Sequence, residues 1–270
     1  MSTIKNIRDL TKSQRKIIRA WCMYDWANSG FATSGIAAIY PIYFVYLFKE
    51  SLGEKTIFWG MTFTGSSVWS LSAVVAASIV AISSPVLGII ADRVPIKKML
   101  LWIYTIAGAI FTMLAFFSAY TATPWAWLIG TFILANIGFA GSLVFYNAFL
   151  PHIAPRELAD EVSSSGYAYG YIGGGLLLLI HLAINIVTSG TEIEDLVTRL
   201  SLSSIGLWWF LWALWTFRVI PEPKIEKPIP GLGILSATKL ATNELKTTFS
   251  ELKNFKIILI YLSAYLLFND

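Results

Sequence analysis

The stretch GIIADRVPIKK, residues 88–98, is a short charged segment between two long runs that contain no charged side chain. No Asp, Glu, Lys or Arg occurs from residue 56 to residue 91 before the Asp-Arg pair, or over the 57 residues from 99 to 155 after the two lysines. A helix needs about 20 apolar residues to cross the hydrocarbon core of a bilayer. The pattern therefore predicts membrane-spanning helices joined by a short polar loop.

The composition of the whole chain supports this interpretation. Of its 270 residues, 56% are hydrophobic and 13% are charged, against about 25% charged residues in typical soluble domains. So few charges cannot cover the surface of a soluble protein, which argues against a cytosolic enzyme, a coiled coil and a disordered chain. The net charge of +4 does not indicate nucleic acid as a partner, because the basic residues lie between the uncharged runs.

Six complete spans are expected. The predicted spans are residues 26–48, residues 64–90, two helices within residues 99–155 that are divided by the turn at 121–124, residues 162–189 and residues 200–217. A further apolar segment, residues 255–270, starts like a seventh span and stops after about four turns, which is too short to cross a bilayer. We therefore expect an all-α membrane protein with a truncated seventh helix.

The distribution of cations predicts the orientation. If the N-terminus is cytoplasmic, 17 of the 20 Lys and Arg residues fall on the inner side, as the positive-inside rule requires. The predicted organisation is a basic cytoplasmic N-terminus (1–20), a six-helix half (21–220), a cytoplasmic linker (221–254) and the seventh helix (255–270). Within the linker, an apolar stripe with nearby lysines predicts a helix on the inner membrane surface, with a disordered linker as the alternative. These residues are Leu245, Phe249 and Leu252, with Lys239, Lys246 and Lys253.

Stripes of small residues predict which helix faces pack closely, because helices in lipid associate by close backbone approach. Three spans carry such stripes: Ser66, Ser70, Ala73, Ala77, Ala81, Ser84 and Gly88; Thr131, Ala135, Gly138 and Ser142; and Ser163, Gly166, Gly170 and Gly173. The sixth span instead carries Trp208, Trp212 and Trp215 with Trp209 beside them. Such an aromatic stripe favours a peripheral, lipid-facing position.

The loop after the second predicted span carries the features of a conformational latch. Gly88 would allow close helix approach, and Asp92 could pair with a cation or with a helix N-terminus. Arg93, Lys97 and Lys98 would hold the loop on the inner side. A simple positive-inside anchor would explain the lysines, but it does not explain the glycine and the Asp-Arg pair at these offsets.

This loop resembles the motif G-x-x-x-D-R-x-G-x-(R/K)-(R/K) of the major facilitator superfamily, with Pro95 in place of the second glycine. The stretch from Gly166 to Gly174 is similar to the tail of that superfamily's antiporter motif, with Tyr171 where proline is usual. Four segments resemble the vacuole-effluxer branch of the superfamily: WCMYDWANSGFA (21–32), YPIYF (40–44), YNAFLPHIA (146–154) and GYAYGYIGGG (166–175).

The resemblance covers essentially the whole chain and implies a transporter of twelve spans. It implies that this chain is the N-terminal half, with its six helices arranged as two three-helix inverted repeats. Fungal members of the branch are associated with amino-acid export from the vacuole. The implied localisation is a prokaryotic cell membrane, or the vacuolar membrane in a eukaryote.

Polar residues at membrane depth are candidates for a transport site. Asp25 is the only charged residue between Arg19 and Lys49, at the start of the first predicted span. It is either a first-turn acid favoured by the helix dipole or a contact for a substrate amine or a coupling proton. Asn28, on about the same face, and Asn147 could line a cavity. Tyr167 and Tyr171 could present hydroxyls to that cavity or bond to a neighbouring helix.

Three further polar positions favour structural roles. Asn136 lies in mid-span and is expected to bond to a neighbouring helix. His181 and Asn185, four residues apart, could titrate or bind a ligand, but structural hydrogen bonding is the favoured interpretation. His152 follows a proline in a loop and is expected to face solvent.

The expected function is secondary transport by alternating access, with a small solute that the resemblance suggests is an amino acid exported with proton coupling. The expected partners are the lipid bilayer, that solute and the missing C-terminal half, without nucleic acid, metal or cofactor. Alone, this half is not expected to transport. A seven-helix receptor conflicts with the six basic residues before the first span, and an intramembrane enzyme lacks a G-x-S-x-G or H-E-x-x-H motif.

Overall fold

A computed structural model describes residues 6–225, 234–252, 255, 257, 259–261 and 264 of the chain. It contains two compact units. The first, which we call the bundle, comprises Met1–Val80 and Ile96–Lys224, and the second unit comprises Ala81–Pro95 and Ile225–Asp270. Predicted features that fall on residues 1–5, 226–233, 253–254 and most of 255–270 lie outside the described residues, including most of the seventh helix.

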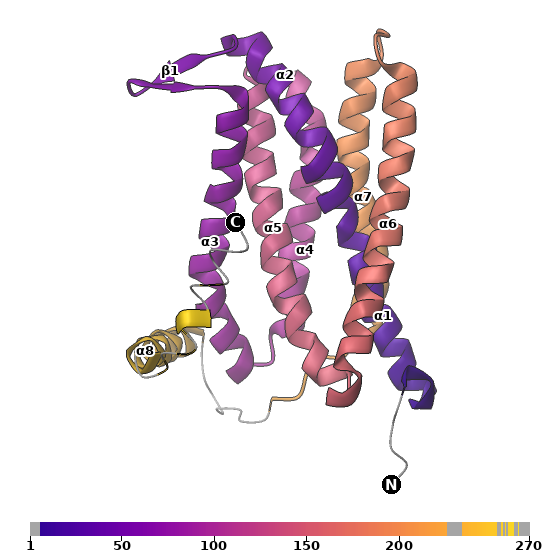
Figure 1. Ribbon diagram of the computed structural model, residues 1–270, viewed down its shortest axis with the longest axis vertical. Coiled ribbons are helices and arrows are strands. Elements are labelled where there is room, and N and C mark those ends of the chain that lie inside the picture. Colours follow the sequence, from indigo (N-terminus) through magenta and orange to yellow (C-terminus); the bar gives the residue numbers. More distant parts are fainter. Residues whose placement is uncertain are drawn as a thin grey trace. The chain divides into compact units, whose positions relative to one another are not determined.

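Within the described residues, six helical segments are long and apolar enough to cross a membrane, which confirms the predicted number of spans (Figure 1). The first segment, Lys12–Leu52, comprises α1 (Lys12–Gly30), η2 (Phe31–Ile39) and α2 (Tyr40–Leu52). The other helices are α3 (Gly65–Arg93), α4 (Lys97–Leu114) continued by η3 (Ala115–Tyr120), α5 (Pro124–Ile153), α6 (Ala159–Thr188) preceded by η4 (Arg156–Leu158), α7 (Glu194–Val219) and α8 (Ile234–Leu252). A single 3-10 turn, η1 (Ile7–Asp9), precedes them.

The first span is not one regular helix. Its middle segment, η2, is a π-helix in which the Tyr40 N–H donates to the Gly35 carbonyl. π-Helical turns are rare and occur frequently at functional sites. The Thr33 hydroxyl lies 2.9 Å from the carbonyl oxygens of both Ser29 and Gly174, so it ties this segment to α6. The span predicted at residues 26–48 therefore changes helical type halfway along its length.

A hairpin precedes the second span. Strands β1 (Thr56–Phe58) and β2 (Met61–Phe63) pair antiparallel with Phe58 opposite Met61. The two connecting residues, Trp59 and Gly60, have positive φ angles of 48° and 76°, as the tight turns of two-residue hairpins require. Residues 56–91 contain no charged side chain and are too many for one straight membrane-spanning helix. The structure divides them between this hairpin and α3.

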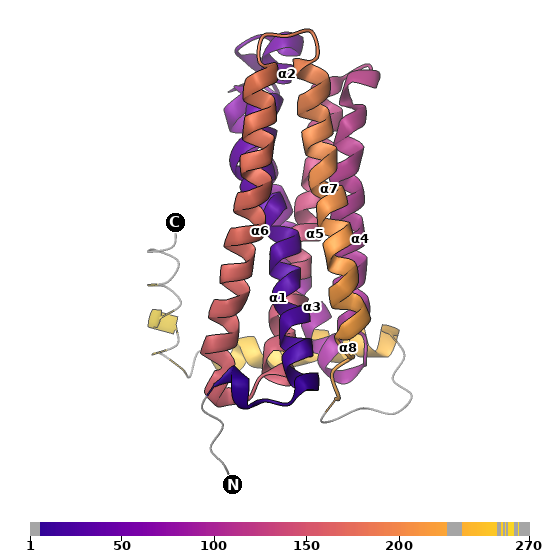
Figure 2. The same cartoon turned by 90° about the vertical axis from the view of Figure 1, so that its right-hand side faces the viewer.

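Glycine contacts hold two helix pairs together within the bundle. A Cβ atom at Gly138 of α5 would lie 2.5 Å from the Cα of Gly108 in α4, and one at Gly174 of α6 would lie 2.9 Å from the Ser29 carbonyl of α1. The small-residue faces of α5 and α6 are therefore buried as predicted. Figure 2 shows α1 between α6 and α7, and α4 packs on both α5 and α7.

The small-residue stripe of α3 does not face the bundle. Ser66, Ser70 and Ala77 are exposed, whereas Ser72 and Ala76 are buried. The buried face lies roughly a quarter turn around the helix from the predicted stripe at 100° per residue. An aromatic contact sets this rotation: the Trp69 ring packs 4.1 Å from the ring of Phe132 in α5.

The tryptophans of the sixth span also differ from prediction. Trp212 and Trp215 are partly exposed, but Trp209 is completely buried. The ring of Trp209 occupies the space beside Gly108, where an added Cβ would overlap it. Trp208 donates a hydrogen bond to the Trp26 carbonyl at 3.3 Å. Placing all four indoles at the periphery was therefore wrong, because the missing side chain at Gly108 makes room for one of them inside.

The second unit contains the end of α3 and the helix α8. Arg93 of α3 forms an ion pair of 2.8 Å with Glu244 of α8. The predicted linker therefore includes a helix. Within it Leu245 is half-buried and Lys239 and Lys246 are exposed, while the side chains of Phe249 and Leu252 lie outside the described residues, as does residue 253.

Candidate functional site

The Asp25 carboxylate lies on a seam between α1 and α6. A Cβ atom at Gly166 would come within 3.1 Å of both the Asp25 Oδ2 atom and the Tyr146 hydroxyl. The ring of Tyr146 stacks on Trp21 at 4.3 Å, and the Trp21 indole N–H donates to the Tyr146 carbonyl at 3.0 Å. Asp25 is half-buried. The absence of a side chain at Gly166 thus leaves room for a carboxylate in an aromatic setting within the first of the six long apolar segments.

Asn28 does not share this setting. Three residues turn an α-helix by 300°, so Asn28 is offset from Asp25 by 60°, which carries it into the bundle, where it is 2% exposed. Its Nδ2 atom has no hydrogen-bond partner among the described residues. Asn28 therefore lies in the interior of the bundle, and its place in a cavity stays a prediction.

The remaining predicted cavity residues are accessible. Tyr167 is 65% exposed and Tyr171 is 77% exposed, and each directly follows a glycine that contacts α1, Gly166 or Gly170. Asn147 of α5 is also exposed, and Asn136 is half-buried. The two tyrosines thus lie on the open side of the seam that holds Asp25.

A separate polar network surrounds the start of α4. The backbone N–H groups of Lys97 and Lys98 donate to the two carboxylate oxygens of Glu222 at 2.8 and 2.9 Å. The Lys98 ammonium donates to the Ile220 carbonyl at 2.6 Å, and the Lys97 Nζ atom lies 3.2 Å from Nε2 of His152. His152 is exposed, as predicted. The two lysines therefore fasten the exit of α7 to the start of α4.

The other latch residues belong to the second unit. Arg93 pairs with Glu244, and Asp92 is exposed. No described atom lies within 4 Å of the position that a Cβ at Gly88 would occupy. The close helix approach predicted at Gly88 is thus not present among the described residues.

Replacement of Glu222 by glutamine is expected to destabilise the bundle by about 1 kcal/mol. A carboxylate at a helix N-terminus satisfies free N–H groups and interacts favourably with the helix dipole, and Gln loses the charge and one acceptor oxygen. Thermal unfolding of the purified variant, followed by tryptophan fluorescence, measures the change. Glu157→Gln, at an exposed acid in η4, is the matched control, and equal melting temperatures for the two variants would contradict this role.

The sequence patterns did not predict the buried cation near the start of α7. Arg199 is 6% exposed, and its Nε atom donates to the Asp195 carboxylate at 2.8 Å. The Tyr43 hydroxyl donates to the other oxygen of Asp195 at 2.6 Å. The guanidinium lies 5.1 and 5.3 Å from the ring centres of Phe116 and Tyr120. The predicted sixth span begins at residue 200 and leaves Arg199 outside it, which hid this cluster, although the Asp195–Arg199 spacing of four residues is the signal of a helical ion pair.

Six membrane-spanning helices packed in this order define a multi-pass membrane protein with the fold of one half of a major facilitator superfamily transporter. A solved structure titled the inward open conformation of the xylose transporter XylE from E. coli matches 88% of this chain and 55% of its own, with a TM-score of 0.52 and 14% sequence identity. The chain belongs to the vacuole effluxer Atg22-like family, whose sequence profile matches residues 13–159 and 154–270.

Two relatives illustrate the range of the family. An uncharacterised MFS-type transporter of Bacillus subtilis, YxiO, is 27% identical over 258 residues, which are 93% of this chain and 56% of the relative. Autophagy-related protein 22-2 of Aspergillus clavatus is 34% identical over 121 residues, which are 42% of this chain and 19% of the relative. The chain therefore spans about half the length of YxiO and a smaller part of the fungal protein. The resemblance noted from the motifs is confirmed, and the major facilitator fold replaces the seven-helix receptor alternative.

Proposed function

We propose that the chain is the N-terminal half of a secondary transporter that works by alternating access and is not an enzyme. Membership of the vacuole effluxer family supports this proposal. The observation that carries it is the position of Asp25, a carboxylate held against Gly166 within a membrane span. Ionisable groups at this depth are costly and are therefore retained mainly for function.

The solute that fits this position carries an ammonium group. A carboxylate favours a cation as its partner, and the exposed Tyr167 and Tyr171 follow the glycines that contact α1 on the same seam. An amino acid has the required amine, and amino-acid efflux is consistent with the family description. The same carboxylate could carry the coupling proton when no amine occupies it, which would link export to the proton gradient.

The second half of the transporter would cover surfaces that this chain leaves open. Ser66, Ser70 and Ala77 form an exposed small-residue face on α3, and such faces suit close helix packing in lipid. With Asn147, Tyr167 and Tyr171 they mark the side on which we place the solute cavity. We place the N-terminus in the cytoplasm of a bacterial cell, because most cations then lie on the inner side.

The contacts of the latch residues would differ between the two states in which the cavity opens to opposite sides of the membrane. Lys97 and Lys98 hold Glu222 immediately after α7, while Arg93 holds Glu244 of α8. Both acids belong to the connection that would join the two halves. Rearrangement of the halves would therefore exchange these contacts, as a two-state element requires.

Asp25→Asn is expected to lower amino-acid transport at least about tenfold. The substitution keeps the size of the side chain but removes a hydrogen bond to a charged group, which contributes about 1.5–3 kcal/mol. Transport is measured as uptake of labelled amino acids into everted membrane vesicles from cells that express the complete product of the gene encoding residues 1–270.

Two controls make this test specific. Asp160→Asn changes an exposed acid in the first turn of α6 and should transport like the unchanged protein. Residues 1–270 expressed alone should insert into the membrane but not transport. Full transport by Asp25→Asn, at equal protein level, would remove Asp25 from the solute site.

A further inference from the structure

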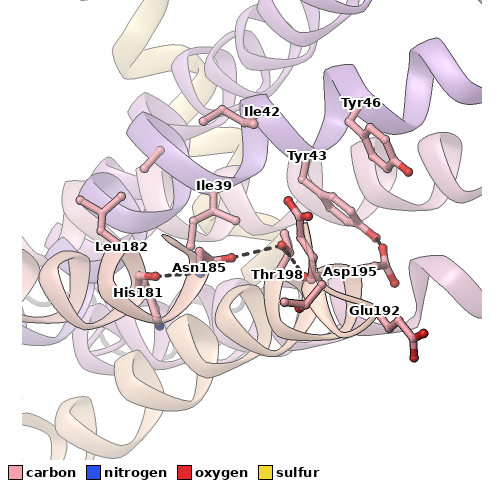
Figure 3. A pocket seen from close by; sticks show the side chains of 13 residues that line it. Ile39, Ile42, Tyr43, Tyr46, His181, Leu182, Asn185, Glu192, Asp195 and Thr198 are labelled. Carbon is pink, nitrogen blue, oxygen red and sulfur yellow. Dashed lines mark hydrogen bonds between the residues drawn. The ribbon is translucent and has the colours of Figure 1, made fainter. Parts of the chain in front are cut away.

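The bundle contains a pocket of about 490 Å³ at the end where the β hairpin lies, between α2, η2, α6 and α7 (Figure 3). This volume is within the range of small-molecule sites, roughly 300–1,000 Å³. Part of the wall is apolar, formed by Ile39, Ile42 and Leu182. The polar lining comes from the end of α6, the turn that follows it and the start of α7, with Tyr43 and Tyr46 from α2. The pocket lies on the far side of η2 from Asp25, more than three turns along the first span.

The polar wall presents acceptors. Three carboxylates line the pocket, those of Glu192, Glu194 and Asp195, and no Lys or Arg side chain is among the described residues that line it. Arg199 lies beside one carboxylate oxygen of Asp195, and the Tyr43 hydroxyl donates to the other. The pocket is therefore acidic, with one of its three acids already balanced by a cation.

A buried histidine packs behind the α6 side of the pocket. His181 lines the pocket, is 3% exposed and has no hydrogen-bond partner for its Nδ1 atom among the described residues. Its Nε2 atom lies 2.8 Å from the Ser204 hydroxyl, which donates its single proton to the Ser201 carbonyl. The histidine Nε2–H must then be the donor in that contact. In the neutral ring this leaves Nδ1 as a lone-pair acceptor, which is buried and does not reach the surface of the pocket.

The neighbouring asparagine is fully engaged and fixes the geometry of this wall. The Asn185 amide donates to the His181 carbonyl at 2.8 Å, and its oxygen accepts from Thr198 at 3.1 Å (Figure 3). The amide also donates to the Ser201 hydroxyl at 2.9 Å. The bonds with Ser201 and Thr198 cross from α6 to α7. The structural role expected for His181 and Asn185 is thus confirmed, and the same bonds hold His181 in place at the pocket.

We propose that this pocket binds a small organic ammonium ion through its acidic wall, with the apolar body of the ligand against Ile39, Ile42 and Leu182. An N–H-rich cation complements the carboxylates, and the exposed Tyr46 ring in the pocket lining provides a face that attracts cations. The site is distinct from the Asp25 seam, and its ligand need not be the transported solute.

The test uses phenethylammonium as the probe, with phenylethanol and phenylpropionate as its neutral and anionic counterparts. Binding to the purified 270-residue chain in lipid nanodiscs is measured by saturation-transfer NMR. We expect binding of the ammonium compound only. Ile42→Arg should reduce its affinity more than tenfold, because it places a cation at the pocket on a side chain that is 73% exposed and so leaves the packed core intact. Glu192→Gln, which removes one exposed carboxylate, should reduce the affinity about three- to tenfold.

Matched variants separate this proposal from its alternatives. Ile57→Arg, at a 70% exposed position in the hairpin, should leave binding unchanged and so controls for added surface charge. Asp25→Asn should also bind the probe normally, whether or not it transports. Binding that is lost in Asp25→Asn but retained in Ile42→Arg would overturn the proposal, and so would equal binding of phenylpropionate.

Discussion

Gly138→Val is expected to prevent stable assembly of the bundle. A Cβ atom at this position would lie 2.5 Å from both the Cα and the backbone nitrogen of Gly108, and 2.8 Å from the Tyr104 carbonyl. These are backbone atoms, so no side-chain rotation relieves the overlap, and α4 and α5 would have to separate. Overpacking in a core costs about 1–3 kcal/mol when side chains can adjust, and a backbone collision should exceed the upper value.

The same helix offers the control for this substitution. Gly130 also lies within α5, and no described atom is within 4 Å of its Cβ position. Gly130→Val therefore carries the same change in helix propensity without the collision. We expect Gly130→Val to elute as a single species in detergent size-exclusion chromatography, and Gly138→Val to aggregate or to melt at least about 6–12 °C lower. Similar behaviour of the two variants would show that α4 and α5 do not pack in this way.

Arg199→Leu is expected to destabilise the bundle by about 3 kcal/mol. The substitution leaves Asp195 without its cation, and breaking a buried ion pair costs about 3–5 kcal/mol. We take the lower end because the Asp195 side chain is 47% exposed and water can partly replace the arginine. The contacts to Phe116 and Tyr120 and the hydrogen bond from Arg199 to the Phe116 carbonyl are lost as well.

Two comparisons isolate the role of this arginine. Arg218→Leu removes an exposed cation near the other end of α7 and should change the melting temperature little. Asp195→Asn combined with Arg199→Leu should be less destabilised than Arg199→Leu alone, because no unpaired carboxylate remains. Additive effects of the two substitutions would mean that Asp195 and Arg199 do not interact.

Much of the fold follows from the sequence alone. Uncharged runs fixed the number of spans, and the turn at residues 121–124 separated α4 from α5 because a proline begins the second helix. The glycines of α6 predicted its packing face, because a glycine in a membrane helix has few other uses than close approach. What these patterns share is that one local property, hydrophobicity or side-chain size, decides the outcome.

Features that depend on two distant segments could not be predicted in this way. The buried position of Trp209 requires the space beside Gly108, about a hundred residues earlier in the chain. The rotation of α3 depends on the contact between Trp69 and Phe132. In the candidate site, Asp25 stood out because charge at membrane depth is rare, whereas the depth of Asn28 depended on a 60° offset that sequence spacing alone resolves poorly.

The π-helical segment η2 has a consequence for how this span can vary among relatives. A π turn closes its hydrogen bond over one more residue than an α turn. The segment therefore contains more residues per turn than the α-helices on either side of it. Deleting a single residue between Phe31 and Ile39 would convert the stretch to regular α-helix while leaving each end in register with its own neighbours. Alignments of this family should therefore tolerate a one-residue gap within this segment.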